Sequence, residues 1–252
     1  MAQMVHSVKQ DMQCLAAMWF GRITGDTHKE RLQAFYSSQA QAYDAFRAGF
    51  LHGREQMLVE CASRLQGRSG MVWVDLGGGT AENVRMLSRC LDLSAFQNIY
   101  VVDLCSALCD VAAAKVEGFG WTNVEVIEED ACEFRPPAPA TLVTFSYSLS
   151  MIPQFIKVID RALSYLDVDG IVGVADFTTS AKFDKPERQH SWLRRWFWRA
   201  VFDLDCIDLG PERRQYLEHR LATGKVFSFQ WLTIFLQSTR ITALAKSHTF
   251  LF

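Results

Sequence analysis

The chain has 252 residues, of which 49% are hydrophobic and 21% are charged, an ordinary globular composition that suffices for one α/β domain with additions. The formal net charge of −2 gives no global attraction to nucleic acid, and the histidines form no HExxH motif, so neither nucleic-acid binding nor a metal site is expected. Seven cysteines without a CxxC pair, and no secretory signal, predict reduced thiols in the cytosol. No apolar run approaches the roughly 20 residues of a membrane-spanning helix.

Residues 1–70 are expected to be mainly helical and to precede the first strand. The stretch 35–47 carries aromatic residues, including Tyr43, at roughly helical spacing. Aromatic residues at this spacing can dock a helix on a sheet, and docking alone would explain Phe35 and Phe46. Residues 54–66 predict a further helix, which the glycine-containing sequence at 67–70 ends.

The most informative stretch is 72–83, Val-Trp-Val-Asp-Leu-Gly-Gly-Gly-Thr-Ala-Glu-Asn. An apolar run ends in Asp75, three glycines follow at 77–79, and a helical pattern continues to about Leu91. This order predicts a strand at 71–76, a tight turn and a helix. Glycines allow close approach of a ligand, and the helix behind them presents free N–H groups. Such a turn at the head of a parallel sheet is where nucleotide-like ligands bind.

The residue spacing decides which ligand is expected. A dinucleotide fingerprint needs glycine at its sixth position, which is a glutamate here, and the Gly-Lys-Ser/Thr ending of a phosphate-binding loop is missing. The pattern Asp75-x-Gly77-x-Gly79-x-Ala81 instead resembles the first motif of class I S-adenosylmethionine (AdoMet) methyltransferases, with Ala81 in place of the usual last glycine. The resemblance implies that Gly77, Gly78 and Gly79 fit the amino acid tail and ribose of AdoMet. It also implies that Asp75 binds the ammonium group, directly or through water; a glycine turn that only closes a buried strand is the alternative.

An acidic residue ends the second predicted strand, 98–103. Asp103 lies about twenty residues after the glycines and next to Leu104, where two carboxylate oxygens match the two hydroxyls of a ribose. Capping the following helix, 105–117, is the alternative for Asp103, and the two roles are compatible.

A second acidic turn follows the third predicted strand, 124–127. In methyltransferases of this fold, an aspartate here commonly faces the adenine amino group, and the next backbone N–H faces a ring nitrogen. Asp130 and Ala131 occupy these positions. A solvated acidic turn is the alternative.

The fourth predicted strand, 141–145, leads into Ser146 and Tyr147, which face the cofactor pocket if the sheet is wound as proposed. Hydroxyl groups there would orient a methyl acceptor. The predicted acceptor-side residues are Tyr147, Tyr43 and Asp176, on the basis of their positions alone. The sequence does not assign a general base to any residue.

A helix at 154–166, a turn at 167–170 and a fifth strand at 171–177 complete the pattern. Five strands alternating with helices predict an α/β fold with a Rossmann-like, doubly wound parallel sheet, as in class I AdoMet methyltransferases.

Several stretches resemble the methyltransferase module (BtaB-type) of betaine lipid synthases, from about residue 35 to 221. The stretches that carry this resemblance are 74–83, 100–105, 143–153, 197–205 and 207–214, of which the last two are the most specific to the family. The resemblance implies three successive N-methylations of the amino group of diacylglyceryl-homoserine, with AdoMet as cofactor. It also implies a partner, a 3-amino-3-carboxypropyl transferase module or protein that makes the homoserine ether.

A tyrosine-rich helix precedes the first strand in many small-molecule and lipid methyltransferases and covers the cofactor. The resemblance therefore implies that residues 35–47 form a lid. Within it, Tyr43 and Arg47 are the residues expected to contact AdoMet.

Residues 179–221 form a basic and aromatic segment. If the chain is helical from Ser191, one stripe of the helix holds Trp192, Trp196 and Phe197, and the arginines lie mostly off it. Tryptophan together with arginine suits the head-group layer of a membrane, where each basic residue adds about 1 kcal/mol of attraction. A helix packed over the mouth of the active site, with its aromatic residues buried, is the alternative.

These patterns divide the chain into a helical preface and lid at 1–70, an AdoMet-binding domain at 71–178, the basic and aromatic segment at 179–221 and a tail at 222–252. The tail departs from betaine lipid synthases, although 226–236 is apolar enough to replace an edge strand. An inactive, truncated chain that binds AdoMet or a partner, and a methyltransferase of a soluble small molecule, are the alternative functions. The lipid interpretation predicts a cytoplasmic protein, peripheral on an endomembrane such as the endoplasmic reticulum.

Overall fold

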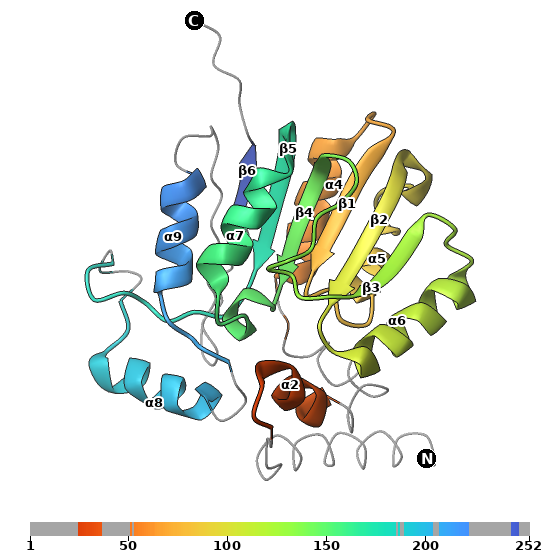
Figure 1. Ribbon diagram of the computed structural model, residues 1–252. Coiled ribbons are helices and arrows are strands. Elements are labelled where there is room, and N and C mark those ends of the chain that lie inside the picture. Colours follow the sequence, from red (N-terminus) through yellow and green to blue (C-terminus); the bar gives the residue numbers. More distant parts are fainter. Residues whose placement is uncertain are drawn as a thin grey trace, which may run out of the picture.

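The computed structural model describes residues 25–36, 51, 53–184, 186, 189–203, 207–221 and 243–246. In this part of the chain a six-stranded sheet is covered by helices (Figure 1). The strands are β1 (Met71–Leu76), β2 (Phe96–Asp103), β3 (Val124–Glu128), β4 (Ala140–Ser146), β5 (Leu166–Ala175) and β6 (Ala243–Lys246). The helices are α2 (His28–Tyr36), α4 (Arg54–Leu65), α5 (Glu82–Leu87), α6 (Ser106–Phe119), α7 (Phe155–Ser164), α8 (Trp192–Asp203) and α9 (Glu212–Leu221), with 3-10 turns at Leu93–Ala95 and Leu149–Met151.

The first five strands are parallel and lie in the order β3-β2-β1-β4-β5. The order reverses between β1 and β4, which makes this point of the sheet the switch point at which ligands bind in such folds. The predicted Rossmann-like, doubly wound sheet is confirmed. β6 pairs antiparallel with β5, so the tail supplies an edge strand, whereas the predicted replacement strand at 226–236 lies outside the described residues.

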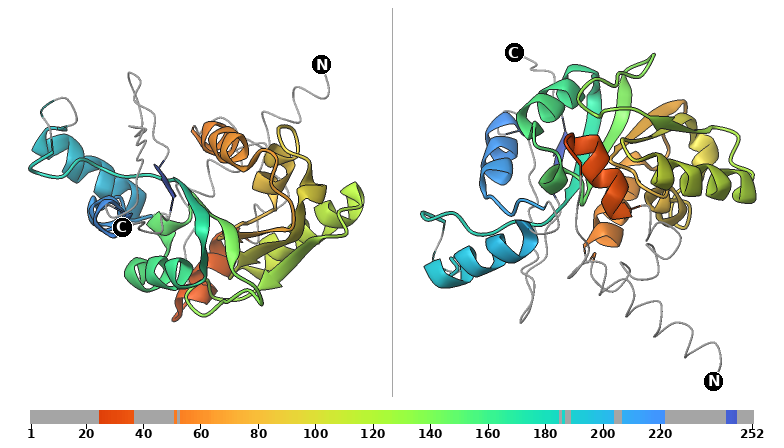
Figure 2. Two further views of the ribbon diagram at one scale, coloured as in Figure 1. Left: turned by 90° about the horizontal axis from the view of Figure 1, so that it is seen from above. Right: turned by 60° about the horizontal axis from the view of Figure 1, so that its bottom comes forward.

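Apolar side chains cover both faces of the central strands, and all six residues of β1 are buried. On one face they pack with α4, α5 and α6, and on the other with α7 and α9 (Figure 2). Strands buried on both faces read as continuous apolar runs, which is why their positions were visible in the sequence.

The predicted boundaries differ from the structure mainly at β5 and α5. The sequence predicted a turn at 167–170 and a strand at 171–177, but β5 already begins at Leu166. Ala140 and Leu142 of β4 pair with Leu166 and Ile171 of β5. β5 therefore contains three extra residues between these two pairs, and the strand is irregular there. α5 ends at Leu87, four residues earlier than predicted, and turns follow it.

α4 approaches β5 closely at Gly173. A Cβ added there would lie 2.6 Å from Met57 Sδ and 2.9 Å from Cys61 Sγ, and both sulfur-bearing residues are fully buried. We expect Gly173→Ala to lower the free energy of unfolding by about 1–3 kcal/mol, because the helix has to move away from the sheet. Urea denaturation measures this change.

Gly118→Ala in α6 is the matched control, since a Cβ added at Gly118 meets nothing within 4 Å. It is expected to raise the free energy of unfolding by up to ~1 kcal/mol, because alanine is the better helix former. Equal effects of the two substitutions would contradict the close contact between α4 and β5.

Candidate functional site

A cavity of about 350 Å³ lies at the carboxyl ends of the strands, next to the switch point between β1 and β4. We call it the carboxyl-edge cavity. The predicted site residues that line it are Gly77, Gly79, Asp103, Leu104, Asp130, Ala131, Ser146 and Tyr147. These residues come from the ends of β1, β2, β3 and β4 and are brought together because parallel strands end at the same edge of a sheet. The volume falls in the range of roughly 300–1,000 Å³ found for small-molecule sites.

Each glycine after β1 is required for a different reason. Gly77 has a φ of +68°, and a Cβ added to it would lie 2.4 Å from Ser148 Cβ. A Cβ added to Gly78 would lie 2.7 Å from Val101 Cγ1. Gly79 has a φ of +56°, and a Cβ there would meet nothing within 4 Å. The first two glycines therefore let the loop pack against its neighbours, while the third leaves open space at the cavity.

Asp75 is fully buried beneath this loop and does not line the cavity. Asn83 Nδ2 donates to both carboxylate oxygens at 2.9 Å, and Thr144 Oγ1 donates to Oδ1 at 2.6 Å. Burial raises the pKa of Asp75 to about 6, against the effect of the hydrogen bonds from Thr144 and Asn83. This geometry does not favour the direct contact with a ligand that the sequence suggested, and the contact through water stays a prediction.

Asp103 lines the cavity and connects the glycine loop to β2. Its Oδ2 accepts from Gly79 N and its Oδ1 from Cys105 N, both at 2.9 Å. Burial raises its pKa, and the hydrogen bonds from these two amides limit the rise. Each oxygen accepts one of these bonds and retains a further lone pair that can face the cavity.

The turn after β3 and the end of β4 complete the lining. Asp130 Oδ1 accepts from Cys132 N at 2.8 Å, and Ala131, which is buried, follows directly. Ser146 Oγ is buried and has no hydrogen-bond partner within the described part of the chain. Since buried polar atoms are almost always satisfied, this hydroxyl is an opening for a ligand or a water.

Tyr147 has a φ of +57°, which is uncommon for a residue other than glycine. Its N–H donates to Ala175 O at 2.7 Å, and its ring lies 4.5 Å from that of Phe177. Burial, and then the charge of Asp176, raise the pKa of the phenol. The hydroxyl therefore stays protonated at neutral pH and serves as a hydrogen-bonding group, not as a base. Backbone strain of this kind costs about 1–3 kcal/mol and concentrates at functional sites.

Asp176, a further predicted acceptor-side residue, does not line this cavity. Asp176 accepts from Ser150 N at 2.9 Å and from Phe177 N at 2.7 Å, so its carboxylate orders the turn after β4 and does not line the cavity. Burial raises its pKa. Tyr43 lies outside the described residues, as does Arg47.

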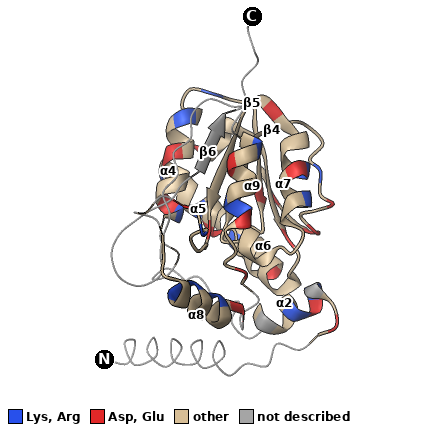
Figure 3. Cartoon of the chain, turned by 90° about the vertical axis from the view of Figure 1, so that its left-hand side faces the viewer, with Lys and Arg blue, Asp and Glu red and all other residues tan. Residues whose placement is uncertain are grey.

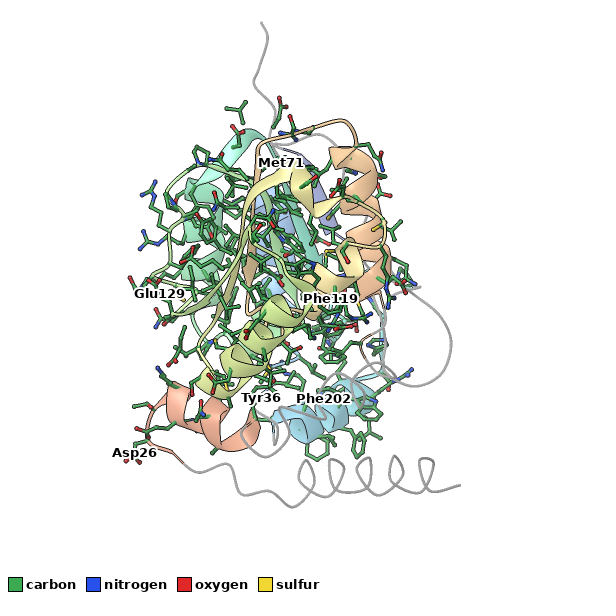
Figure 4. All side chains as sticks on the ribbon, turned by 90° about the vertical axis from the view of Figure 1, so that its right-hand side faces the viewer. Asp26, Tyr36, Met71, Phe119, Glu129 and Phe202 are labelled. Atoms are coloured by element: carbon green, nitrogen blue, oxygen red, sulfur yellow. The ribbon has the colours of Figure 1, made fainter. Side chains whose placement is uncertain are left out.

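Helix α2 overlaps the predicted lid, 35–47, only at its last two residues, and it borders the cavity. Its residues Leu32 and Tyr36 line the cavity, and Tyr36 Oη donates to Met151 Sδ at 3.0 Å. Figure 4 shows Tyr36 at the opposite end of the molecule from Met71, where β1 begins. The only sequence signal for this helix was the aromatic pair at its end, and the remainder of the predicted lid lies outside the described residues.

Two further observations apply to the described ranges only. No helix there is long and apolar enough to cross a membrane. No group of three or more histidine, cysteine or acidic residues is arranged to hold a metal ion in that part of the chain.

Comparison with solved structures identifies the fold. Phosphoethanolamine N-methyltransferase 2 of Haemonchus contortus matches with a TM-score of 0.60 and 15% identity, over 79% of this chain and 45% of that chain. N-methyltransferase NodS of Bradyrhizobium japonicum WM9 matches with a TM-score of 0.53 and 14% identity, over 78% of this chain and 95% of that chain. An rRNA methylase of Streptococcus thermophilus matches with a TM-score of 0.50 and 13% identity, over 79% of this chain and 96% of that chain. These names cover different acceptors, so the fold by itself leaves the substrate open.

Comparison of sequences identifies the family. A search of curated proteins finds no match. A profile of the family described as methyltransferase domain matches residues 50–219, which are 170 of the 252 residues. The chain therefore belongs to this methyltransferase domain family and is an AdoMet-dependent methyltransferase.

Proposed function

We propose that AdoMet binds in the carboxyl-edge cavity with its amino acid tail on the glycine loop, its ribose hydroxyls on Asp103 and its adenine beside Asp130 and Ala131. The open space at Gly79 supports this orientation, because it leaves room for a ligand against the backbone. The free lone pairs of Asp103 and the unpartnered hydroxyl of Ser146 support it as well.

The side chains around the cavity are suited to positioning an acceptor. AdoMet supplies a methyl group that its positively charged sulfur has already activated. What the protein has to contribute is alignment and exclusion of water, and alignment can lower a barrier by roughly 7–11 kcal/mol at most. Tyr147 would hold the acceptor amine by accepting an amine N–H at its hydroxyl oxygen, which leaves the nitrogen lone pair free to attack, and α2 would exclude water through Leu32 and Tyr36.

We propose that the acceptor is an amine on a lipid head group, reached at a membrane surface. The observation that carries this proposal is helix α8, which buries none of its residues. Trp192 is 70% exposed, Trp196 59% and Phe197 50%. α8 lies beside the carboxyl edge of the sheet, at the same end of the molecule as α2 (Figure 1), and Lys and Arg positions occur along it (Figure 3). Exposed aromatic and basic residues on one helix suit the head-group layer of an anionic membrane.

The resemblance to betaine lipid synthases specifies the rest of this proposal. The acceptor would be diacylglyceryl-homoserine, methylated three times on its amino group. A 3-amino-3-carboxypropyl transferase would be the partner that makes this lipid, and the site of action would be the cytoplasmic face of an endomembrane such as the endoplasmic reticulum.

Mass spectrometry of lipids tests the proposed reaction. The chain is incubated with AdoMet and vesicles that contain diacylglyceryl-homoserine, and we expect species with one, two and three added methyl groups. Turnover of water-soluble amines without vesicle association would instead favour a small-molecule methyltransferase. AdoMet binding without any methyl transfer would favour an inactive chain that only binds AdoMet or a partner.

Attachment to a membrane through α8 predicts that substitutions in this helix weaken binding to vesicles. Replacing Trp192 and Trp196 by alanine is expected to weaken binding to anionic vesicles about tenfold or more, because burial of only about 60 Å² of apolar surface contributes ~1.4 kcal/mol. Affinity for S-adenosylhomocysteine should not change, since neither residue lines the carboxyl-edge cavity. Co-sedimentation measures binding to vesicles, and calorimetry measures the affinity for S-adenosylhomocysteine.

Ile156→Ala is the matched control for an exposed apolar residue, since Ile156 is 49% exposed on α7. It should leave vesicle binding unchanged. If it weakens vesicle binding as much as the paired tryptophan substitutions do, attachment through α8 is wrong.

The pKa of Asp75 predicts how AdoMet affinity depends on pH. Asp75 is protonated below its pKa of about 6 and negatively charged above it. AdoMet is positively charged at its sulfur and its ammonium group, so its affinity should rise as the pH increases through about 6 and should fall below it. The charge of Asp103 raises this pKa and that of Arg54 lowers it. Calorimetry between pH 5 and pH 8, roughly one to two units either side of this pKa, measures the effect.

Asp75→Asn should flatten this dependence, because the amide does not titrate. The neutral analogue 5′-methylthioadenosine is the ligand control. The affinity of the unmodified protein for this analogue should lack the part of the pH dependence that the charge of Asp75 causes. An unchanged pH dependence of AdoMet binding in Asp75→Asn would show that another group is responsible.

A further inference from the structure

A second cavity, of about 660 Å³, lies against α8, and we call it the α8 cavity. Among the described residues it shares no lining residue with the carboxyl-edge cavity. One wall is a single face of α8, because its lining residues recur at helical spacing. These residues are Trp192, Arg195, Trp196, Arg199, Ala200 and Asp203. The opposite wall comes from the chain after β5 and from the chain that leads into α9.

Hydrogen bonds hold the wall opposite α8 in place. Thr179 donates to Leu209 O from its backbone N–H at 2.8 Å and from its hydroxyl at 2.9 Å, which ties the chain after β5 to the chain before α9. Ser180 Oγ accepts from His190 N at 2.8 Å. A hydroxyl that accepts in this way still has its own proton to donate, so Ser180 offers a donor to the cavity.

The basic residues of the α8 cavity have donors available for an anion. Arg195 Nε is buried and has no hydrogen-bond partner in the part of the chain that the structure describes. Arg199 lies 3.6 Å from Asp208 Oδ1, too far for a hydrogen bond. That carboxylate is already bound by Arg213 Nη1 at 2.8 Å and by Gly210 N at 2.9 Å. An anionic group in the cavity would satisfy the buried nitrogen that the fold leaves unpaired.

The lining also contains groups that attract a cation. Asp203 and Glu212 add negative charge to that of Asp208. Trp192 and Trp196 lie one helical turn apart, and the face of an indole ring is the best aromatic partner for an ammonium group. A ligand with only negative charge would meet these carboxylates unfavourably, whereas a ligand with both charges matches the whole lining.

The α8 cavity lies near the site of methyl transfer. The ring of Phe202 on α8 lies 5.4 Å from that of Phe177, which lies 4.5 Å from the ring of Tyr147 in the carboxyl-edge cavity. Figure 4 shows Phe202 at the same end of the molecule as Tyr36. Leu193 on α8 is exposed beside the tryptophans, where acyl chains would contact it.

We propose that the α8 cavity binds a lipid head group that carries both an anion and a quaternary ammonium group. The anion lies against Arg195 and Arg199, and the ammonium group lies against Trp192 and Trp196. Two kinds of lipid share this chemistry. One is a phosphocholine lipid of the surrounding membrane. The other is a betaine lipid with a trimethylated homoserine, and this second source rests on the proposed function.

Equilibrium binding of short-chain lipids below their micelle concentration tests the site without turnover or vesicles. Dihexanoylphosphatidylcholine carries both charges, and dihexanoylphosphatidic acid has the phosphate but no ammonium group. Calorimetry on protein saturated with S-adenosylhomocysteine should show tighter binding of the phosphatidylcholine. Arg195→Gln should weaken binding of both lipids by about tenfold or more, because a charge-assisted hydrogen bond is lost. Trp196→Leu should reduce the preference for the phosphatidylcholine by about twofold to fivefold.

A third lipid distinguishes the two sources. Tighter binding of short-chain diacylglyceryl-trimethylhomoserine than of the phosphatidylcholine would identify the betaine lipid as the ligand, and the reverse order would identify the phosphocholine lipid. All three titrations use lipid monomers and measure binding only. A failure of methyl transfer or of vesicle attachment therefore leaves them interpretable.

Arg194→Gln is the matched control, because it removes the same charge from the same helix and Arg194 does not line the α8 cavity. It should leave the affinity for both phospholipids unchanged, and melting temperatures check that each variant is folded. Equal weakening by Arg194→Gln and Arg195→Gln would overturn the proposal. So would binding of the phosphatidic acid to the unmodified protein that is as tight as binding of the phosphatidylcholine, a comparison that needs no variant.

Discussion

The buried carboxylate of Asp75 is the interaction on which the site depends. It accepts hydrogen bonds from Asn83 at the start of α5 and from Thr144 in β4, and so joins the three elements that meet at the switch point. Trp73 Nε1 donates to Thr144 Oγ1 at 2.8 Å, which leaves the hydroxyl proton of Thr144 free to point at Asp75. These hydrogen bonds tie the end of β1 to α5 and β4 beneath the glycine loop, and Asn83 Oδ1 is left buried without a partner in the described part of the chain.

The cavity above this network combines a rigid backbone with negative charge. Gly77 and Gly78 are held by contacts that exclude a side chain, and Asp103 accepts from Gly79 N. A site prepared in this way suits a cationic cofactor, because its carboxylates are already in place before the ligand arrives.

The same edge of the sheet carries the cover of the cavity and the exposed helix α8 (Figure 1). Tyr36 on α2 contacts Met151 in the turn after β4, so the cover rests on the segment that also contains Tyr147. An enzyme that takes its acceptor from a membrane needs an opening near the surface it contacts. The exposed aromatic residues of α8 would provide that contact without a membrane-spanning helix.

The sequence by itself determined the alternation of strands and helices, and with it the edge at which Asp103, Asp130 and Tyr147 meet, because buried parallel strands are continuous apolar runs that end in turns. The resemblance of its glycine motif to that of class I AdoMet methyltransferases indicated the cofactor class. Only the tertiary structure decided that Asp75 lies beneath the loop and that Asp176 orders the turn after β4 and does not line the cavity. These properties depend on which distant segments pack around each side chain, and no local pattern encodes that.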